Sequence, residues 1–127
     1  MHGDAGNAGR ILISEGGAIS EIRTTRNSDD NGDLRFYTEI SGSRALRMKI
    51  DYSGHLTPAS DNTYDLGTSS LRWRNLYTTD LQLSNKGKTN DVDGTWGDWT
   101  LQEGENDIFM INNRTGKKFT ITMREGS

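Results

Sequence analysis

Two tryptophans flank an acid near the end of this 127-residue sequence, and this group is the first candidate for ligand binding. Residues 96–99 read Trp-Gly-Asp-Trp, and indole rings beside an acid and flexible glycines can form a platform on which sugar rings stack. Trp99 alternates with Leu101, so we expect it in the core, whereas Trp96 should be partly exposed. Residues 112–114 lie in an expected turn, where polar side chains can contact a partner. Plain packing and an ordinary turn are the alternatives. The candidate binding residues are Trp96, Asn112, Asn113 and Arg114.

An acidic segment, residues 29–33, has part of the spacing of a calcium-binding loop. Asp29, Asn31 and Asp33 fit the first, third and fifth positions of an EF-hand pattern. The sixth position holds Leu34 instead of glycine, and no glutamate stands at the twelfth. A simple acidic turn is the better interpretation, and we expect neither a metal ion nor a cofactor.

Catalytic motifs are not evident. A glycosidase needs two carboxylates with separate roles, but among 18 acidic residues many pairs can be drawn, so their presence discriminates little. The sequence contains no nucleophile elbow, no phosphate-binding glycine loop and no H-E-x-x-H motif. We therefore expect no catalytic residues and no enzyme activity.

Composition argues against a self-contained hydrophobic core. Leu, Ile, Val and Phe make up 23 of the 127 residues, about 18%, below the roughly 20% of ordinary globular chains. Disorder also calls for high net charge, and here the formal net charge is only −3. A polar chain with sparse, periodic apolar positions can fold if identical copies cover one another's apolar faces.

The same numbers exclude several classes of protein. A pI near 5.3 with basic residues scattered singly argues against nucleic-acid binding. No apolar run reaches the length of a membrane span, and the first residues lack the basic and apolar regions of a signal peptide. Without cysteine, disulfides and thiolate metal sites are excluded.

The elements that must position these residues are mostly strands. Short apolar runs at 11–13 and 18–22 flank a Gly-Gly turn, and residues 34–40 and 46–50 alternate with period two, which predicts a half-buried hairpin. In that hairpin we expect Leu46, Met48 and Ile50 on one face. Trp73, Leu76 and Tyr77 are spaced three and four apart after a possible N-cap at residues 68–70, which predicts one or two helical turns.

The remaining residues suggest a second unit. A strand is expected at 81–83, a linker at 84–94, and then an antiparallel meander whose Asn-rich turns supply the positive φ of hairpins. The expected organisation is thus a flexible arm at 1–9, a β segment at 10–83, the linker, and a small C-terminal β module at 95–127.

Two phrases in the sequence resemble bacteriophage tail fibres and tailspikes. Residues 47–56, RMKIDYSGHL, are similar to the phrase RMRID-x-SG-x-(L/V) of fibre shafts. Residues 58–77, PASDNTYDLGTSSLRWRNLY, are similar to the more specific phrase P-x-x-DN-x-x-x-LG-x-x-x-x-RW-x-x-(L/I)Y. The resemblance covers residues 34–83, and in many relatives a self-cleaving chaperone domain follows the second phrase. Only 44 residues follow Leu83, too few for that domain, and they resemble a short terminal module of virion proteins. Either a chaperone domain has been removed or the chain never had one.

The resemblance implies an elongated, intertwined homotrimeric β-structure about a fibre axis, with the 95–127 module as its tip. It implies a virion protein made in the host cytoplasm that attaches to a host cell-surface glycan or protein and contacts other virion proteins. His55 lies in the patterned region, and three copies near an axis could share a metal, but fibres usually use an H-x-H phrase and Leu56 follows here. The expected trimer core consists of Leu66, Trp73, Leu76 and Tyr77.

Two other functions remain open at this stage. One is an assembly protein of the neck, baseplate or whiskers, which touches only other virion proteins; a buried tip would favour it, whereas an exposed aromatic tip favours attachment. The other is a fragment of a polysaccharide-depolymerising tailspike, which calls for an acidic groove between subunits.

Overall fold

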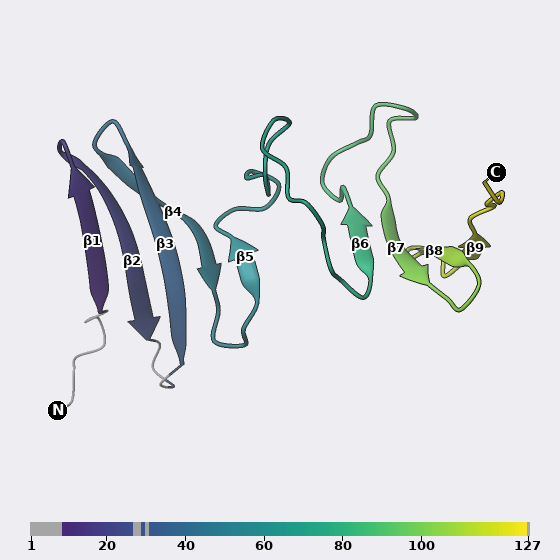
Figure 1. The fold of residues 1–127 in the computed structure, drawn as a ribbon, viewed down its shortest axis with the longest axis horizontal. Helices are drawn as coiled ribbons and strands as arrows, with labels where there is room; N and C mark the ends of the chain where they lie inside the picture. Colours follow the sequence, from purple (N-terminus) through teal and green to yellow (C-terminus); the bar gives the residue numbers. More distant parts are fainter. Residues whose placement is uncertain (1–8, 27–28, 30, 127) are drawn as a thin grey trace. The chain divides into compact units, whose positions relative to one another are not determined.

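The chain folds into strands and turns. The computed structural model describes residues 9–26, 29 and 31–126, and within these residues it contains nine strands and no helix (Figure 1). Two units are distinguished, residues 1–72 and 73–127, and each holds one antiparallel sheet. The prediction of an all-β fold is confirmed. The expected arm at 1–9 lies outside the described residues except for Gly9, whose carbonyl accepts a hydrogen bond from the Thr24 N–H.

The first sheet is a five-stranded meander in which each strand pairs with the next. Its two tight hairpins turn at residues 16–17 and 41–42, and both positions of each turn have positive φ, as type I′ turns require. The hairpin predicted at 34–40 and 46–50 is confirmed. The strands are β1 (Arg10–Glu15), β2 (Ala18–Arg26), β3 (Gly32–Ile40), β4 (Ser43–Ile50) and β5 (Leu56–Pro58).

The second sheet has four strands in sequence order. The strand at 81–84 was expected to be the last strand of the first segment, but it pairs with β7. The boundary between the two units therefore precedes this strand in the sequence. Residues 85–97 connect the two strands as a hydrogen-bonded loop, in which Asn90 Oδ1 accepts from the N–H groups of Val92 and Asp93. The expected linker is therefore the loop of a hairpin. The strands are β6 (Leu81–Ser84), β7 (Asp98–Glu103), β8 (Ile108–Asn112) and β9 (Lys118–Thr120).

The helical turns predicted around Trp73 are wrong. Thr68 closes a single turn: its Oγ1 accepts from the Leu71 N–H at 2.9 Å, and its own N–H donates to the Leu71 carbonyl at 2.9 Å. Beyond that turn no residue of 72–77 is helical. A short helix needs an apolar face packed against a neighbour to offset the cost of its first turn. In this chain Trp73 is 69% exposed, and such packing is absent.

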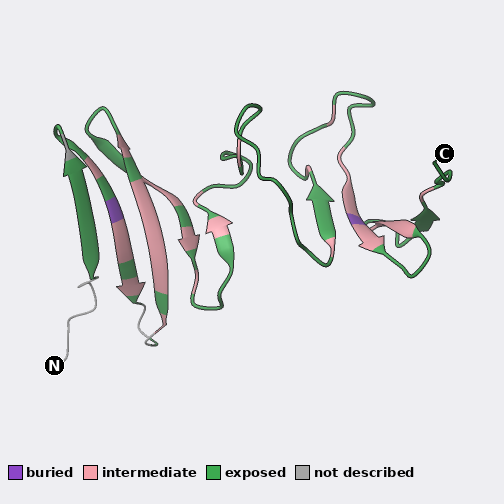
Figure 2. Cartoon of the chain, viewed as in Figure 1, coloured by how far each residue is buried: buried purple, intermediate pink, exposed green. Residues whose placement is uncertain are grey.

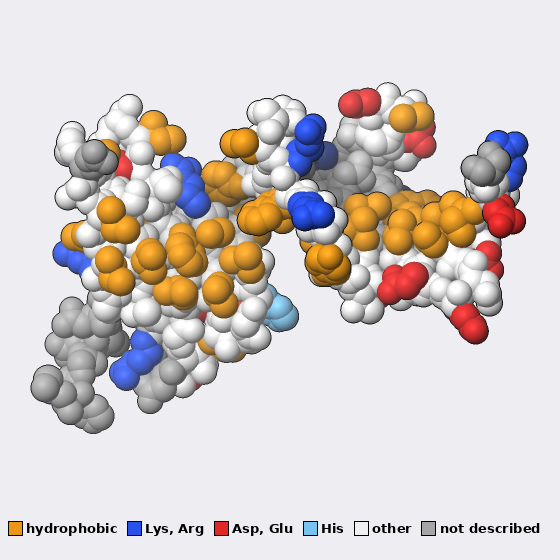
Figure 3. All heavy atoms as spheres, viewed as in Figure 1, with side chains coloured by type: hydrophobic (Ala, Val, Ile, Leu, Met, Phe, Trp, Pro, Cys, Tyr) orange, Lys and Arg blue, Asp and Glu red, His pale blue; other side chains and the backbone are white. Residues whose placement is uncertain are grey.

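One face of the first sheet is apolar from edge to edge. Residues that pair directly across antiparallel strands share a face, and the register aligns one apolar row across all five strands. A second row runs parallel to it, through Leu34, Ile50 and Leu56. Figure 3 shows apolar side chains gathered over these strands. The five-strand row is Ile11, Ile22, Phe36, Met48 and Pro58.

A β-bulge changes which side chains of β4 reach that face. Phe36 pairs with Met48 but Tyr37 pairs with Leu46, so Arg47 is the extra residue. An extra residue shifts the alternation by one position, and Leu46 therefore lies on the face opposite to Met48. The prediction that Leu46 shares a face with Met48 and Ile50 is wrong for this reason.

The second sheet has the same division into faces. One row across its four strands is apolar, and Leu83 and Trp99 pair beside it (Figure 3). The opposite face carries polar side chains on β6 and β7, where Thr100 Oγ1 donates to Gln82 Oε1 at 2.7 Å and Gln102 Nε2 donates to Asp80 Oδ2 at 2.9 Å. On β8 this face carries Ile111 and Phe109, which pair with Thr100 and Gln102. The apolar row is Leu81, Leu101, Met110 and Phe119.

Neither apolar face is covered within its own unit. Among the described residues no hydrophobic side chain is buried, and the two buried residues, Glu21 and Thr100, are polar (Figure 2). Each sheet is a single layer, whereas stable domains pack two or three layers around an apolar core. Within each unit, no second layer of the described residues packs on the apolar face.

The other face of the first sheet carries ion pairs. Arg23 Nε donates to Glu21 Oε1, and Arg44 Nη1 lies 2.9 Å from Glu21 Oε2. Arg35 Nη2 donates to Asp33 Oδ2 at 3.0 Å. The hydrogen bond from Arg23 holds the pKa of Glu21 below its usual value, and the bond from Arg35 does the same for the pKa of Asp33. Both carboxylates are therefore expected to be ionised in the folded chain at neutral pH.

These lowered pKa values make the sheet sensitive to acid. A carboxylate with a lowered pKa stabilises the folded state above its unfolded pKa, and this contribution is lost as the pH falls through its folded pKa. We expect Glu21→Gln to unfold at a lower temperature than the wild type at pH 7. The difference between the two unfolding temperatures should narrow below about pH 4. Thermal unfolding followed by circular dichroism at pH 7 and pH 3 measures it. A gap that stays constant with pH would contradict the ion-pair account.

Candidate functional site

The second unit brings the predicted binding residues together at one end of its sheet. Trp99 of β7 pairs with Asn112 of β8, so the turn after β8 lies beside the residues that precede β7. The Arg114 guanidinium stacks over the Trp96 ring, 3.8 Å from its centroid, and Arg114 Nη1 donates to the Trp96 carbonyl at 2.8 Å. An arginine over an indole face is a favourable cation–π geometry.

The two asparagines hold this cluster in place. Asn112 Oδ1 accepts from the N–H groups of Arg114 and Thr115 at 3.0 and 3.2 Å, which shapes the turn. Asn113 Nδ2 donates to Asp98 Oδ1 at 2.9 Å and to Thr100 Oγ1 at 3.0 Å, which ties the turn to β7. The side-chain oxygen of Asn112 and the amide of Asn113 are thus engaged within the chain. Trp96 and Arg114 are the members of the set that are best placed to meet a ligand.

Trp96 and Trp99 have different neighbours. Trp96 is half-buried under Arg114, in agreement with its expected partial exposure. Trp99 lies on the apolar face of the sheet, where its ring centroid is 5.7 Å from that of Phe119, but it is only half-buried because that face is uncovered. Gly97 lies between them, and a Cβ at this position would come within 2.8 Å of the Trp99 indole nitrogen. The sequence pattern around Trp96 and Trp99 does not indicate this close approach.

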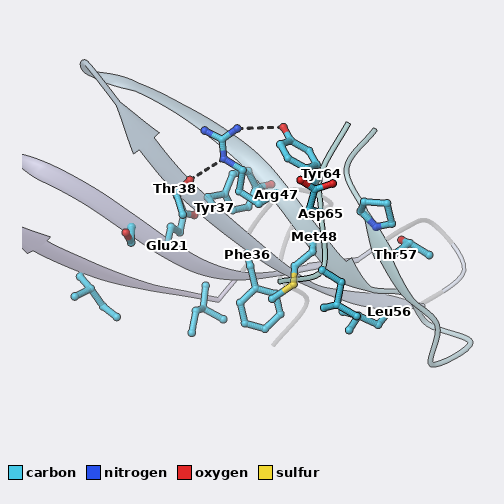
Figure 4. Close-up of a pocket in the computed structure, with 15 residues that line it drawn as sticks. Glu21, Phe36, Tyr37, Thr38, Arg47, Met48, Leu56, Thr57, Tyr64 and Asp65 are labelled. Atoms are coloured by element: carbon cyan, nitrogen blue, oxygen red, sulfur yellow. Dashed lines mark hydrogen bonds between the residues drawn. The ribbon is translucent and has the colours of Figure 1, made fainter. Parts of the chain in front are cut away.

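A groove of about 680 Å³ lies on the apolar face of the first sheet (Figure 4). Arg47, the bulge residue, forms one wall: its Nε donates to Thr38 Oγ1 at 2.7 Å and its Nη1 donates to Tyr64 OH at 3.1 Å. These bonds hold the 64–66 segment beside the sheet. The alternation of residues in β4 does not reveal the groove, because the bulge at Arg47 turns this side chain toward Tyr64. The apolar lining residues are Ile13, Ile22, Phe36, Met48, Leu56, Pro58 and Leu66.

The residues expected to form the trimer core are exposed in the single chain. Leu66 lines the groove of the first unit and is 75% exposed. Trp73, Leu76 and Tyr77 belong to the second unit, where Tyr77 is 89% exposed. Four large apolar side chains within twelve residues are thus left in water by a single copy of the chain.

The other sequence candidates, the acidic segment and His55, make contacts within the first unit. In the acidic segment, Asp30 lies outside the described residues, and Asp33 pairs with Arg35 and with Lys49. His55 is exposed in a turn, and its backbone N–H donates a hydrogen bond to Asp51 Oδ1 at 3.0 Å. Within the described part of the chain, no group of three His, Cys, Asp or Glu residues is placed to hold a metal ion. That part of the chain also has no helix long and apolar enough to cross a membrane.

Comparison with known proteins gives one similar structure. No protein-family model matches the chain, and no curated protein matches it. The carboxy-terminal domain of the bacteriophage T5 L-shaped tail fibre, solved with its intramolecular chaperone domain, is similar at 23% sequence identity and a TM-score of 0.48. The match covers 68% of this chain and 26% of that chain, so this chain spans about a quarter of its length.

The different roles of Asn112 and Asn113 can be tested with one substitution at each. Asn113→Asp removes the donor to Asp98 and puts two carboxylates in contact, so we expect it to lower the free energy of unfolding by about 1–3 kcal/mol at pH 7. The loss should shrink below about pH 4, where the carboxylates become protonated. Urea unfolding of the variant and the wild type at pH 7 and below about pH 4 measures the loss in the free energy of unfolding.

Asn112→Asp is the matched control for this prediction. Asn112 is used as an acceptor, and aspartate keeps both acceptor bonds. The control should therefore unfold close to the wild type at pH 7. Equal losses for the two variants would mean that the turn is not tied to β7 by the Asn113 amide.

Proposed function

We propose that the chain is a structural and receptor-binding part of a phage tail fibre, which acts in the virion as a homotrimer and attaches it to the host cell. The observation that carries the proposal is that both sheets have an uncovered apolar face while no described hydrophobic residue is buried. The two fibre-like phrases, residues 47–56 and 58–77, support it from the sequence.

The amount of exposed surface supports assembly. Large apolar side chains are exposed in both units, for example Leu56 at 61% in the first unit and Trp73 at 69% in the second. Contiguous exposed apolar patches on a protein surface mark interaction sites. Each further copy of the chain brings the same two apolar sheet faces, so copies of the chain can cover one another's faces.

A copy of the chain also offers what the groove needs. The groove on the first sheet is lined mainly by apolar side chains, and the 66–77 segment exposes the side chains of Trp73, Leu76 and Tyr77. In the proposed trimer these side chains form a layer between subunits with Leu66, and the apolar sheet faces turn toward the other copies.

Attachment is assigned to the cluster of Trp96 and Arg114. Its indole edge and guanidinium combine an apolar surface with free donors, which suits a sugar or a polar protein loop. Three copies of one weak site gain affinity through effective concentration, so a trimer suits an attachment protein.

Trp73→Ala tests the trimer. Truncating a tryptophan packed between subunits costs about 3–5 kcal/mol per chain, so the variant should be monomeric or aggregated in light scattering. Tyr52→Ala is the control: Tyr52 is 65% exposed and Trp73 is 69% exposed in the single chain, but Tyr52 stands at an unspecified position of the fibre phrase. The control should behave as the wild type. A Trp73→Ala variant with wild-type mass and melting would remove Trp73 from the interface.

Trp96→Ala tests attachment. Labelled wild-type protein is applied to a panel of bacterial cells and to their isolated surface polysaccharides, and the variant should bind more weakly by about 1–2 kcal/mol per site with its mass unchanged. Trp99→Ala, on the apolar face, should instead destabilise the second unit. If the wild-type protein is trimeric but binds no cell or glycan, the role of an assembly protein in the virion becomes the better account.

A further inference from the structure

The charged face of the first sheet has two cations for each of two carboxylates. Arg23 and Arg44 both contact Glu21, and Arg35 and Lys49 both contact Asp33. A face built only to stabilise the sheet needs one cation for each carboxylate. The second cation leaves each set with a net positive charge, although Glu39 pairs directly opposite Arg44 across β3 and β4.

Depth separates the two signs of charge. The side chains of Glu21 and Asp33 are 0% and 14% exposed, whereas the four cationic side chains are 28–33% exposed. The carboxylates thus lie beneath and the cations lie above them. A molecule that approaches this face meets guanidinium and ammonium groups first.

The strand register brings these cations into one row. Arg10 pairs with Arg23, Arg23 pairs with Arg35, and Arg35 pairs with Lys49, across β1 to β4. Like charges directly opposite each other on neighbouring strands destabilise a sheet. Adjacent strands are about 4.8 Å apart, so the row extends over roughly 14 Å. Glu21 and Asp33 offset part of this repulsion within the sheet, and an anionic ligand of that length would offset more of it from the solvent side.

We propose that this charged face binds an acidic polysaccharide, one that carries carboxylate or sulfate groups. The proposal rests on the proposed function, in which the apolar face of the same sheet is covered by other copies and the charged face remains in solvent. It identifies a second host contact, separate from the cluster of Trp96 and Arg114.

The face is less suited to nucleic acid. Proteins that hold single strands combine cations with free aromatic rings on which bases stack. Arg23 covers the Tyr37 ring on this face, with its guanidinium carbon 4.9 Å from the centroid. A sugar polymer with spaced acidic groups needs the cations alone, and arginine forks match carboxylate and sulfate oxygens.

The test removes only the second cation of each set. The double variant Arg44→Gln/Lys49→Gln leaves the pairs of Arg23 with Glu21 and of Arg35 with Asp33 in place, so the sheet should keep its fold. The control Lys86→Gln/Lys88→Gln makes the same change in net charge on the loop of the second unit. Binding to dextran sulfate, neutral dextran and duplex DNA is measured on the full chain at low and high salt.

Wild-type protein and the control should bind dextran sulfate and not neutral dextran, and binding should weaken with salt. The double variant should bind dextran sulfate about tenfold more weakly or worse, since two charge-assisted contacts are lost. Equal weakening in the control, no effect in the double variant, or binding to duplex DNA without binding to dextran sulfate would overturn the proposal. Light scattering on the same samples measures whether the protein is a trimer. A trimer that does not bind dextran sulfate would contradict only this inference and not the proposed assembly.

Discussion

Burial of apolar surface is the constraint on which this structure depends. Each sheet places its large apolar side chains in aligned cross-strand rows, such as Ile22, Phe36 and Met48 in the first unit. Backbone pairing satisfies the strands' hydrogen bonds, but it leaves one side of each row open. A single-layer sheet gains little from the hydrophobic effect until something covers that side, and folding is therefore expected to depend on association. Coupling of this kind makes stability depend on protein concentration.

The opposite faces of the sheets follow from the same constraint. If the apolar faces meet other copies, then the ion pairs of Glu21 and Asp33 and the hydrogen bonds of Thr100 belong to the outer surfaces. The two candidate ligand contacts lie apart from the apolar rows: the cations above Glu21 and Asp33, and the stacked pair of Trp96 and Arg114. Assembly and ligand binding then use different residues, so variants can separate them.

The sequence predicted what depends on local period and turn chemistry. Alternation around Phe36 and Met48 identified the central hairpin, and Asn-rich turns identified the meander that holds Trp99. The sequence did not predict the features that depend on how residues pair across neighbouring strands. The bulge at Arg47 leaves no mark in the pattern of apolar residues, so Leu46 was placed on the wrong face. The stacking of Arg114 on Trp96 joins residues 18 apart and depends on how β7 pairs with β8. The spacing of Trp73, Leu76 and Tyr77 suggested a helix, but three apolar residues with helical spacing do not form one without a surface to pack on.

Sedimentation equilibrium of the wild-type chain over a range of concentrations tests the central claim most directly. The account predicts a single folded species of about three times the 14.2 kDa chain mass, with dissociation on dilution accompanied by loss of β-structure in circular dichroism. A monomer of 14.2 kDa that stays folded at micromolar concentration would contradict it, because its two apolar sheet faces would then be stable in water without a partner.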